Sequence, residues 1–380
     1  MEVLKDYLLV CYGLVTILFL FLGLVKWMKE NRKKQVGVFS LKELTVIVPF
    51  RDEKARLPEL LNTLQNQTAL PAHYIFVNDH STDAGVAFIA EELSKHTKLN
   101  YTILDLPEGR HGKKSAILFA MEWVKTEFFL LQDADVFMSV DYFENLRNLP
   151  NGDLIILPVE MVGYSIQQYF YSLDHFMINT INWMFSLLYP LTASGANLIV
   201  RKSSFMELTF DDYNEAVASG DDQFILHDFR KSKKKIFLEG SHKYLVKTQA
   251  PLSFIEFINQ RLRWAGKTAK IGDVVELMVG GLGMILTFTF FSLIFYYLWI
   301  EDVQLALCLF MLKLVCDTLV YGCFFLYQKR PFYLLLLPIM QAIYPFYALL
   351  VTVLLPFYSP KWKGRAIYNA TRETKKGTLK

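Results

Sequence analysis

The sequence has few cysteines, and none of them is placed to form a disulfide framework or a zinc site. The 380-residue chain contains 4, all inside apolar stretches, with no Cys-x-x-Cys pair and no neighbouring histidine. They are Cys11, Cys308, Cys316 and Cys323. We interpret them as small apolar packing residues.

The chain also lacks a strong excess of either charge. Lys and Arg number 40 against 37 Asp and Glu, so the net charge is +3. The basic residues lie in short runs beside apolar segments, which is not the pattern of a nucleic-acid-binding protein. Hydrophobic residues reach 53% and are concentrated at the two ends, which excludes disorder and predicts a membrane protein with a soluble middle part. We expect an anionic membrane surface or a phosphate as its partner.

Residues 7–27 form an almost uncharged segment. At a rise of ~1.5 Å per residue, a helix of this length spans ~30 Å, the thickness of a hydrocarbon core. The segment lacks a basic start and a small-residue cleavage site, so we expect residues 1–28 to be a retained anchor rather than a signal peptide. The basic residues that follow place the next part of the chain in the cytoplasm.

Residues 273–358 form the second apolar region, which an acidic break and a basic break divide into three stretches. Three full spans would put the basic tail, residues 359–380, outside the cell. We expect Pro338 and Pro345 to bend the third stretch into a re-entrant or interfacial hairpin that returns the tail to the cytoplasm.

Between these regions, residues 41–272 alternate short β-rich apolar runs with helical periods. This alternation predicts an α/β domain with a mostly parallel sheet, which binds ligands at the carboxyl ends of its strands. Acidic residues cluster at these expected ends: Asp52, Glu53, Asp79, Asp133 and Asp135. Such a set can hold the base, the ribose and the divalent cation of a nucleotide diphosphate. A lone Asp-x-Asp or a lone Asp79 is equally typical of a turn or a helix cap.

Three further segments have two interpretations each. Gly109–Ser115 carries three cations into a helix, which suits a diphosphate or a solvated helix start. Ser194–Asn197 is a run of small residues that lets the backbone approach a ligand, or a tight strand entry. Asp221 and Asp222 begin a predicted helix, where they are either a cap or a pair of like charges that makes one a general base.

Residues 252–270 predict an amphipathic helix in the membrane interface. Its apolar stripe is Phe254, Phe257, Ile258, Leu262 and Ala265. Gln260, Arg263 and Trp264 lie three and four residues apart, so they share the other face.

The strand-end acids, the acidic pair and the Gln-x-x-Arg-Trp pattern follow one another along the chain. With these motifs in this order, the sequence resembles the inverting nucleotide-sugar glycosyltransferases of family 2. These have the GT-A fold, an α/β fold with a Rossmann-like, mostly parallel sheet. The resemblance covers roughly Leu44 to Gly266, and the last pattern marks membrane-embedded members such as cellulose, chitin and hyaluronan synthases and ceramide glucosyltransferase. N-terminal and C-terminal transmembrane helices would flank the fold here.

The resemblance implies a role for each motif. Pro49, Phe50, Arg51 and Glu53 would line the base pocket. Asp79 would bind the nucleoside, Asp133 the ribose or a sugar hydroxyl, and Asp135 would coordinate Mg²⁺ or Mn²⁺. The resemblance assigns the diphosphate to Lys113 and Arg263, the sugar and acceptor surroundings to Gly195, substrate binding to Gln260, and acceptor stacking to Trp264. It makes Asp222 the general base, oriented by Asp221. The family usually has Asn where this chain has Asp52.

We therefore expect a membrane-bound inverting glycosyltransferase that moves a sugar from a nucleotide-diphosphate sugar, UDP-sugar favoured, to a hydroxyl of a lipid. Its catalytic domain would face the cytoplasm at a bacterial inner membrane. The interfacial helix and the few C-terminal spans favour a lipid over a growing glycan. A processive polysaccharide synthase and a non-catalytic nucleotide-sugar-binding membrane subunit are the alternatives.

Overall fold

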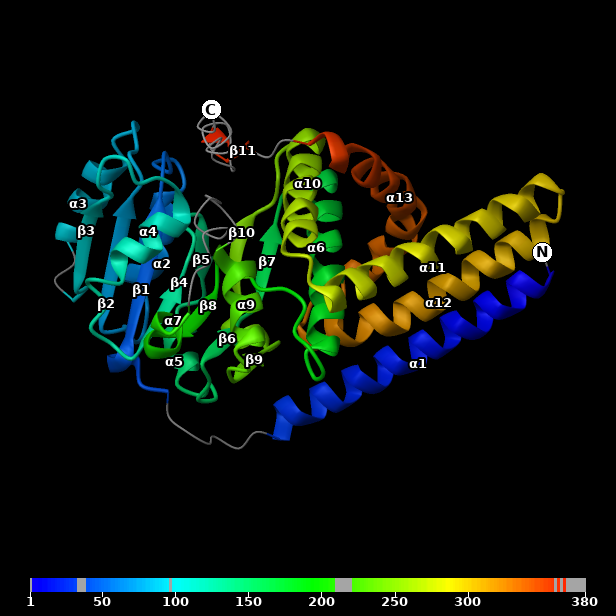
Figure 1. The fold of residues 1–380 in the computed structure, drawn as a ribbon, viewed down its shortest axis with the longest axis horizontal. Helices are drawn as coiled ribbons and strands as arrows, with labels where there is room; N and C mark the ends of the chain where they lie inside the picture. Colours follow the sequence, from blue (N-terminus) through cyan, green and yellow to red (C-terminus); the bar gives the residue numbers. More distant parts are fainter. Residues whose placement is uncertain are drawn as a thin grey trace, which may run out of the picture. The chain divides into compact units, whose positions relative to one another are not determined.

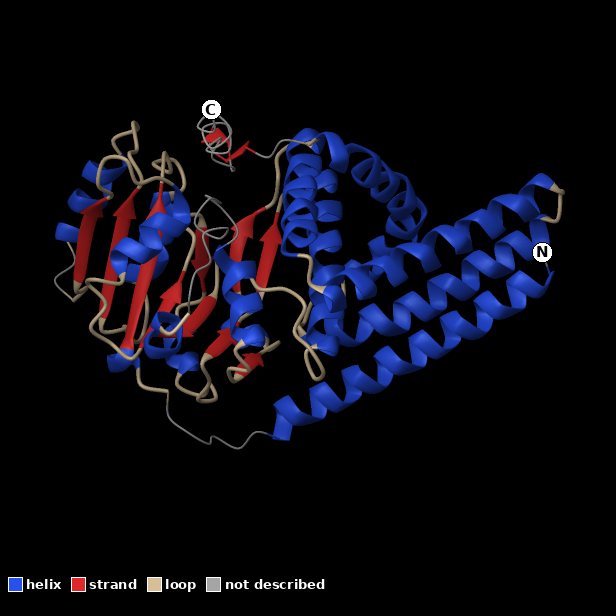
Figure 2. Ribbon diagram, in the orientation of Figure 1, coloured by secondary structure: helices blue, strands red, loops and turns tan. Residues whose placement is uncertain are grey.

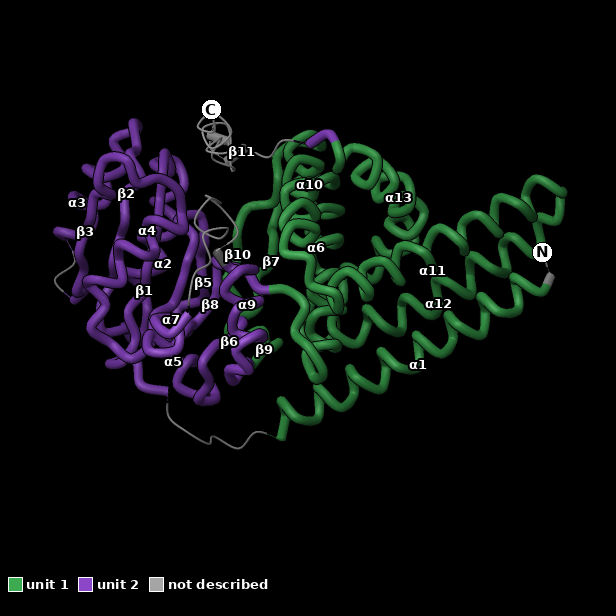
Figure 3. Tube along the Cα trace, viewed as in Figure 1, with its two compact units in different colours: residues 1–36, 157–192, 237–356 green, residues 37–156, 193–236, 357–380 purple. Residues whose placement is uncertain are grey.

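The computed structural model describes residues 2–32, 39–95, 98–208, 221–358, 361–362 and 365–366. The chain forms two compact units, each built from segments that are far apart in the sequence (Figure 3). Unit 1 contains residues 1–36, 157–192 and 237–356, and unit 2 contains residues 37–156, 193–236 and 357–380. Residues 157–192 and 237–272, which lie within the predicted catalytic domain, therefore group with the apolar helices.

Unit 2 alternates strands and helices along the chain (Figures 1 and 2). Its elements are η1 (Leu41–Glu43), β1 (Leu44–Phe50), α2 (Leu57–Gln65), β2 (His73–Asn78), α3 (Gly85–Ser94), β3 (Tyr101–Asp105), α4 (Gly112–Ala120), β4 (Phe128–Leu131), β5 (Val136–Met138), α5 (Tyr142–Leu146), β6 (Leu154–Ile156), β8 (Leu198–Arg201), α7 (Lys202–Met206), α9 (Asp221–Lys231), β11 (Lys361–Trp362) and β12 (Arg365–Ala366).

The main sheet of unit 2 runs in the order β3-β2-β1-β4-β8-β6. β1 pairs in parallel with β2 and β4, β2 pairs in parallel with β3, and β8 is antiparallel to β4 and β6. All seven residues of β1 are buried, as expected for a parallel strand that is covered on both faces. The mostly parallel sheet predicted from the sequence is confirmed.

Unit 1 is mainly helical (Figure 2). Its elements are α1 (Glu2–Arg32), β7 (Val159–Val162), α6 (Ile166–Phe185), β9 (Ile236–Leu238, which begins at the last residue of unit 2), η2 (His242–Tyr244), β10 (Val246–Gln249), α10 (Phe254–Ile271), α11 (Val274–Trp299), α12 (Val303–Tyr327), α13 (Tyr333–Leu354) and η3 (Leu355–Phe357). β7 and β10 pair in parallel.

In the described part of the chain, four helical segments are long and apolar enough to cross a membrane. They are Val3–Arg32, Val274–Trp299, Val303–Tyr327 and Tyr333–Phe357. α13 is one continuous helix with Pro338 and Pro345 inside it, so the expected hairpin is wrong. Proline removes one helical hydrogen bond and bends a helix, but the rest of the segment is apolar and continues it. Cys11, Cys308 and Cys323 are exposed rather than buried, because an apolar helix face turned to lipid needs no protein cover.

A glycine and an aspartate make the sharp turn between α10 and α11. Gly272 ends α10 with a φ of 67°, in the left-handed region that glycine adopts without strain. Asp273 then begins α11, and its Oδ1 accepts hydrogen bonds from the backbone N–H groups of Val275 and Glu276, each at 3.1 Å. The helix that carries the Gln-x-x-Arg-Trp pattern is thus joined directly to the second candidate span.

Candidate active site

Lys113, Asp133 and Gly195 lie together at the carboxyl ends of the parallel strands of unit 2. Because β8 is antiparallel to β4, with Leu198 opposite Leu131, the residues before β8 lie beside the residues after β4. Lys113 Nζ donates to Asp133 Oδ1 at 2.6 Å and to the carbonyl oxygen of Gly195 at 3.2 Å. Three positions that are far apart in the sequence are therefore brought together.

Asp222 joins the same group through Gly195. The backbone N–H of Gly195 donates to Asp222 Oδ2 at 3.1 Å, and the N–H of Gln223 donates to Oδ1 at 2.8 Å. Asp222 is the second residue of α9 and is half-buried. Both oxygens of this carboxylate are held by backbone donors, which fixes its direction. The side chain of Asp221 lies outside the described part of the structure.

A buried hydroxyl supports the loop beside Gly195. Tyr142 is fully buried, and its OH donates to Asn197 Oδ1 at 2.6 Å. Burial raises the pKa of Tyr142 well above its usual range, so the phenol keeps its proton and remains a donor. The small-residue segment before β8 is thereby anchored to α5.

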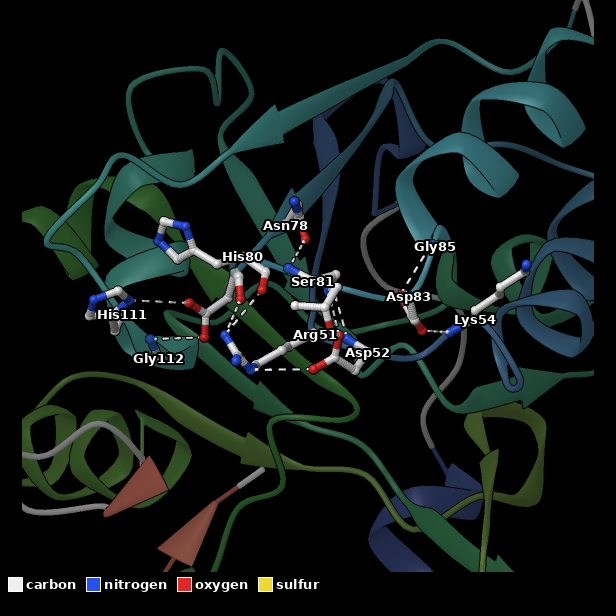
Figure 4. Close-up of polar contacts among 12 residues, drawn as sticks. Arg51, Asp52, Lys54, Asn78, His80, Ser81, Asp83, Gly85, His111 and Gly112 are labelled. Carbon is white, nitrogen blue, oxygen red and sulfur yellow. Dashed lines mark hydrogen bonds and ion pairs between the residues drawn. The ribbon is translucent and has the colours of Figure 1, made fainter. Parts of the chain in front are cut away.

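Asp79 follows β2 and is 1% exposed. Its Oδ2 accepts a hydrogen bond from the backbone N–H of Gly112, at the start of α4, at 3.1 Å. The turn after β2 is closed by a different side chain, because Asn78 Oδ1 accepts the N–H of Ser81 at 2.9 Å (Figure 4). Asn78 therefore makes the turn that the sequence allowed for Asp79, and the Asp79 carboxylate faces α4.

Arg51 and Asp52 tie the loop after β1 to the loop after β2 (Figure 4). Arg51 Nη1 donates to the carbonyl oxygens of Asp79 at 2.8 Å and His80 at 3.3 Å. Asp52 has a φ of 49°, and its Oδ1 accepts the N–H of Thr82 at 2.6 Å. Asn and Asp are the non-glycine residues that adopt this left-handed conformation most readily, and both supply a side-chain oxygen. Asp52 therefore meets both requirements of this position, the left-handed backbone and the side-chain acceptor.

The remaining strand-end residues differ in exposure. Pro49 and Phe50 are buried at the end of β1. Glu53 Oε2 accepts a hydrogen bond from Arg56 Nη1 at 3.2 Å. Asp135 Oδ2 lies 3.9 Å from the same nitrogen, and the Asp135 side chain is 26% exposed. Asp135 is thus accessible to a cation.

Two groups of side chains could hold a metal ion, and their donor atoms differ. Asp135 offers carboxylate oxygen, which suits Mg²⁺ or Mn²⁺. Asp79, His80 and His111 each place one ligand atom within 4.8 Å of the others, the one such group among the described residues. His80 Nε2 lies 3.0 Å from the carbonyl oxygen of Arg110, which accepts and so assigns the ring proton to Nε2. Two imidazoles and one carboxylate suit Zn²⁺ better than Mg²⁺.

The Gln-x-x-Arg-Trp residues lie on α10 in unit 1. Gln260, Arg263 and Trp264 are half-buried. Arg263 Nε is buried and makes no hydrogen bond to another described residue. Of the predicted apolar stripe, three residues are buried and Phe254 is half-exposed: the buried ones are Phe257, Ile258 and Leu262.

Sequence reasoning missed the buried ion pair beside this pattern. Arg261 is 6% and Asp174 is 1% exposed, and Arg261 Nε donates to Asp174 Oδ2. The signal was present, since Asp174 is the single carboxylate in the aromatic segment from Gly163 to Pro190. In the same segment, Phe176 and Trp183 are each 1% exposed, so these two rings pack in the core of unit 1.

Two family models match the chain. The model of glycosyl transferase family 2 matches residues 45–209, and that of glycosyl transferase family group 2 matches residues 128–359. The second match covers more than half of the chain, so the chain belongs to glycosyltransferase family 2. No curated protein sequence matches it.

Several solved structures are similar to this chain. The mannosyltransferase PcManGT from Pyrobaculum calidifontis, in complex with GDP-Man and Mn²⁺, has 16% identity and a TM-score of 0.55, over 91% of this chain and 99% of its own. S. aureus TarS has 17% identity and a TM-score of 0.40, over 60% and 43%. GalNAc-T7 with UDP, GalNAc and Mn²⁺ has 12% identity and a TM-score of 0.43, over 60% and 48%. The predicted GT-A fold is confirmed by the family and by the first of these structures.

Proposed function

We propose that this protein is a membrane-bound inverting glycosyltransferase that transfers a sugar from a nucleotide-diphosphate sugar to a hydroxyl group of a lipid. The observation that carries the proposal is the linked group Lys113, Asp133, Gly195 and Asp222. This group joins one cation and two carboxylates within unit 2, and in this proposal they bind the diphosphate, bind the donor and act as the base. Family membership supports the transferase activity.

In this proposal Asp222 is the general base. A hydroxyl group is a weak nucleophile, and a nearby carboxylate that takes its proton as it attacks speeds the reaction. The hydroxyl attacks the anomeric carbon on the side opposite the nucleotide, so the configuration inverts. Backbone N–H groups hold both Asp222 oxygens and thus keep the carboxylate in one orientation.

The donor would be held by the other strand-end residues. Asp79 would bind the nucleoside, Asp133 a ribose or sugar hydroxyl, and Lys113 the diphosphate. Asp135 would hold Mg²⁺ or Mn²⁺, which neutralises charge on the leaving diphosphate. A UDP-sugar is our first choice of donor, and GDP-sugars are the second because PcManGT was solved with GDP-Man.

The four candidate spans support attachment to a membrane, and therefore a lipid acceptor. The basic residues at the end of α1, Lys29 and Arg32, favour a cytoplasmic position for the catalytic unit, at the inner membrane of a bacterium. A few spans around one catalytic unit also offer little material for a polymer channel.

The test is sugar transfer by the detergent-solubilised protein. Labelled UDP- and GDP-sugars are supplied with a total lipid extract and Mn²⁺ or Mg²⁺, and Asp222→Asn is assayed beside the exposed control Asp141→Asn. We expect label in the organic phase with the wild type and the control, and none with Asp222→Asn.

Other outcomes distinguish the alternatives. Label in aqueous high-mass material would indicate a processive polysaccharide synthase. Nucleotide binding without transfer from any donor would indicate a non-catalytic subunit. Unchanged transfer by Asp222→Asn would refute the assignment of Asp222 as the general base.

A further inference from the structure

Arg261 lies inside the Gln-x-x-Arg-Trp segment of α10 but is buried within unit 1. Its Nε donates to Asp174 Oδ2, Nη1 donates to Gln260 Oε1 at 2.7 Å, and Nη2 donates to the carbonyl oxygen of Tyr171 at 3.3 Å. A guanidinium is planar, so three bonds in three directions leave it one orientation. Arg261 is therefore a fixed group.

The guanidinium of Arg261 also lies against two aromatic rings of its own helix. Its Cζ is 4.5 Å from the ring centroid of Phe257 and 4.4 Å from that of Trp264. These residues are four before and three after Arg261, so both lie on its side of the helix. The expectation that Trp264 lies on the face opposite Phe257 is therefore wrong. His175 contacts Trp264 as well, with 5.5 Å between the ring centroids. The position of the Trp264 indole thus depends on Arg261.

The anchor of Arg261 comes from other helices. Asp174 belongs to α6, and its Oδ1 accepts a second hydrogen bond from the hydroxyl of Tyr347 on α13. A carboxylate held from two sides and desolvated gives a strong charge-assisted bond to Arg261. The place of Arg261 is consequently set by α6 and α13 and not only by α10.

The bond from Arg261 decides which way the Gln260 amide faces. A glutamine amide can turn by about 180°, which exchanges its acceptor oxygen and its donor nitrogen. Because Gln260 Oε1 accepts from Arg261, the Nε2 donors of Gln260 face away from the guanidinium. Without Arg261, both orientations of the amide would be populated.

We propose that Arg261 is a positioning residue for the transfer reaction, which fixes the Gln260 amide and the Trp264 indole in the orientation that receives the acceptor. This proposal rests on the proposed function. Arg261 would act through these two neighbours and would not itself touch the sugar or the reacting hydroxyl. A lysine could keep the charge beside Asp174 but could not make the three bonds and the flat stack together.

The experiment compares Arg261→Lys with the wild type and with Arg147→Lys, an exposed arginine of unit 2. We expect Arg261→Lys to keep its melting temperature and to bind nucleotide within threefold of the wild type. We expect its KM for the lipid acceptor to rise at least tenfold. If Arg261 had a merely structural role, Arg261→Lys would lower the melting temperature and would change the affinity for nucleotide and the KM for the acceptor to a similar extent.

A double-mutant cycle tests whether Arg261 acts through Trp264. If it does, Arg261→Lys with Trp264→Phe raises the acceptor KM no more than Trp264→Phe alone. If the double variant instead raises the acceptor KM by the product of the two single effects, the proposal is overturned. So would wild-type transfer by Arg261→Lys.

A signal that needs no activity separates this proposal from the proposed function. In protein labelled with 5-fluorotryptophan, the ¹⁹F signal of Trp264 is the one that Trp264→Phe removes. We expect Arg261→Lys to shift or broaden that signal, and an unchanged signal would overturn the positioning role even if no donor is used by the wild type. If Arg261→Lys does not fold, Asp174→Asn is the second variant. If neither variant folds, the Arg261–Asp174 pair has only a structural role and the proposal is overturned.

Discussion

Unit 2 and unit 1 treat their charged side chains in opposite ways. In unit 2, the Asp133 side chain is 40% exposed and that of Asp135 is 26% exposed, both at the ends of strands. In unit 1, Arg261 and Asp174 are almost fully buried and bind each other. Asp133 and Asp135 stay accessible to a substrate or a cation, whereas the charges of Arg261 and Asp174 are desolvated and have to be paired. Substitution of the Asp222 carboxylate in unit 2 is therefore expected to affect turnover most, and substitution within the buried pairs of unit 1 to affect stability most.

Other pairs in unit 1 follow the same rule. Arg330 donates from Nε and Nη2 to the two oxygens of Glu160, at 2.6 and 2.7 Å, and this bond raises the pKa of Arg330. Glu30 on α1 accepts hydrogen bonds from Trp183 Nε1 at 3.0 Å and from the Tyr327 hydroxyl at 2.6 Å. Arg330, in the connection between α12 and α13, is thereby joined to β7, and Glu30 joins α1 to α6 and α12.

The largest effect on turnover is expected from Asp222→Asn in unit 2. Loss of a general base lowers kcat by about 10³-fold, or about 4 kcal/mol of activation free energy. The melting temperature should fall only slightly, because Asn retains one oxygen and so loses one of the two bonds from the N–H groups of Gly195 and Gln223. Steady-state kinetics and a thermal melt in detergent measure the two quantities. An Asp222→Asn protein that melts early, or that turns over within tenfold of Asp141→Asn, would break the contrast between the units.

The largest effect on stability is expected inside unit 1, midway along α12. Lys313 Nζ donates to Asp317 Oδ2 and, at 2.7 Å, to Gln341 Oε1, and the Tyr12 hydroxyl donates to Asp317. Removing one partner of a buried pair costs about 3–5 kcal/mol, since a charge is left unpaired. Asp317→Leu should therefore melt far earlier than the wild type in detergent.

The matched variant for this pair is Lys313→Met with Asp317→Leu. It should recover most of the lost stability, because no charge is left buried. If the double variant is less stable than Asp317→Leu alone, Lys313 stabilises the unit by more than its pairing with Asp317.

A smaller effect should separate the two candidate metal sites of unit 2, which are Asp135 and the group Asp79, His80 and His111. Asp135→Ala should weaken Mn²⁺-dependent nucleotide binding on the order of tenfold or more, since loss of a group that only hydrogen-bonds to a metal ligand already weakens metal binding about tenfold. His111→Ala should leave the ratio of nucleotide affinity with and without Mn²⁺ unchanged, but weaken binding of Zn²⁺. Calorimetry with nucleotide and competition with a zinc chelator provide the measurements. The opposite pattern would move the Mn²⁺ site to Asp79, His80 and His111.

The sequence predicted unit 2 better than unit 1 for a physical reason. β1 to β4 and their helices follow from local periodicity, and parallel strands bring their carboxyl ends to one edge whatever the loops do. The meeting of Lys113 with Asp133 follows from that topology. The bond from Gly195 to Asp222 does not, because it depends on the antiparallel β8.

Unit 1 could not be predicted in the same way. Arg261 and Asp174 are 87 residues apart in the sequence, and no local pattern relates them. The amphipathic period of residues 252–270 indicated a helix but not what covers its buried side, so Arg261 was overlooked. The grouping of α6 with the apolar helices likewise depends on contacts between distant segments.

The last expected effect is a pH dependence of stability that distinguishes buried from partly exposed histidines. Burial, with the charge of Arg261 nearby, lowers the pKa of His175 in unit 1 to about 3. The unfolded chain then binds the proton more readily, so this contribution to stability is complete above about pH 6.5 and is lost as the pH falls toward 3. Between pH 7 and 5 the loss is roughly 2 kcal/mol.

His73 in unit 2 is only partly buried and its pKa is lowered too, so it should contribute in the same direction but less. Melting curves of His175→Phe and His73→Phe at both pH values test this, and an equal flattening of the pH dependence by the two variants would contradict it.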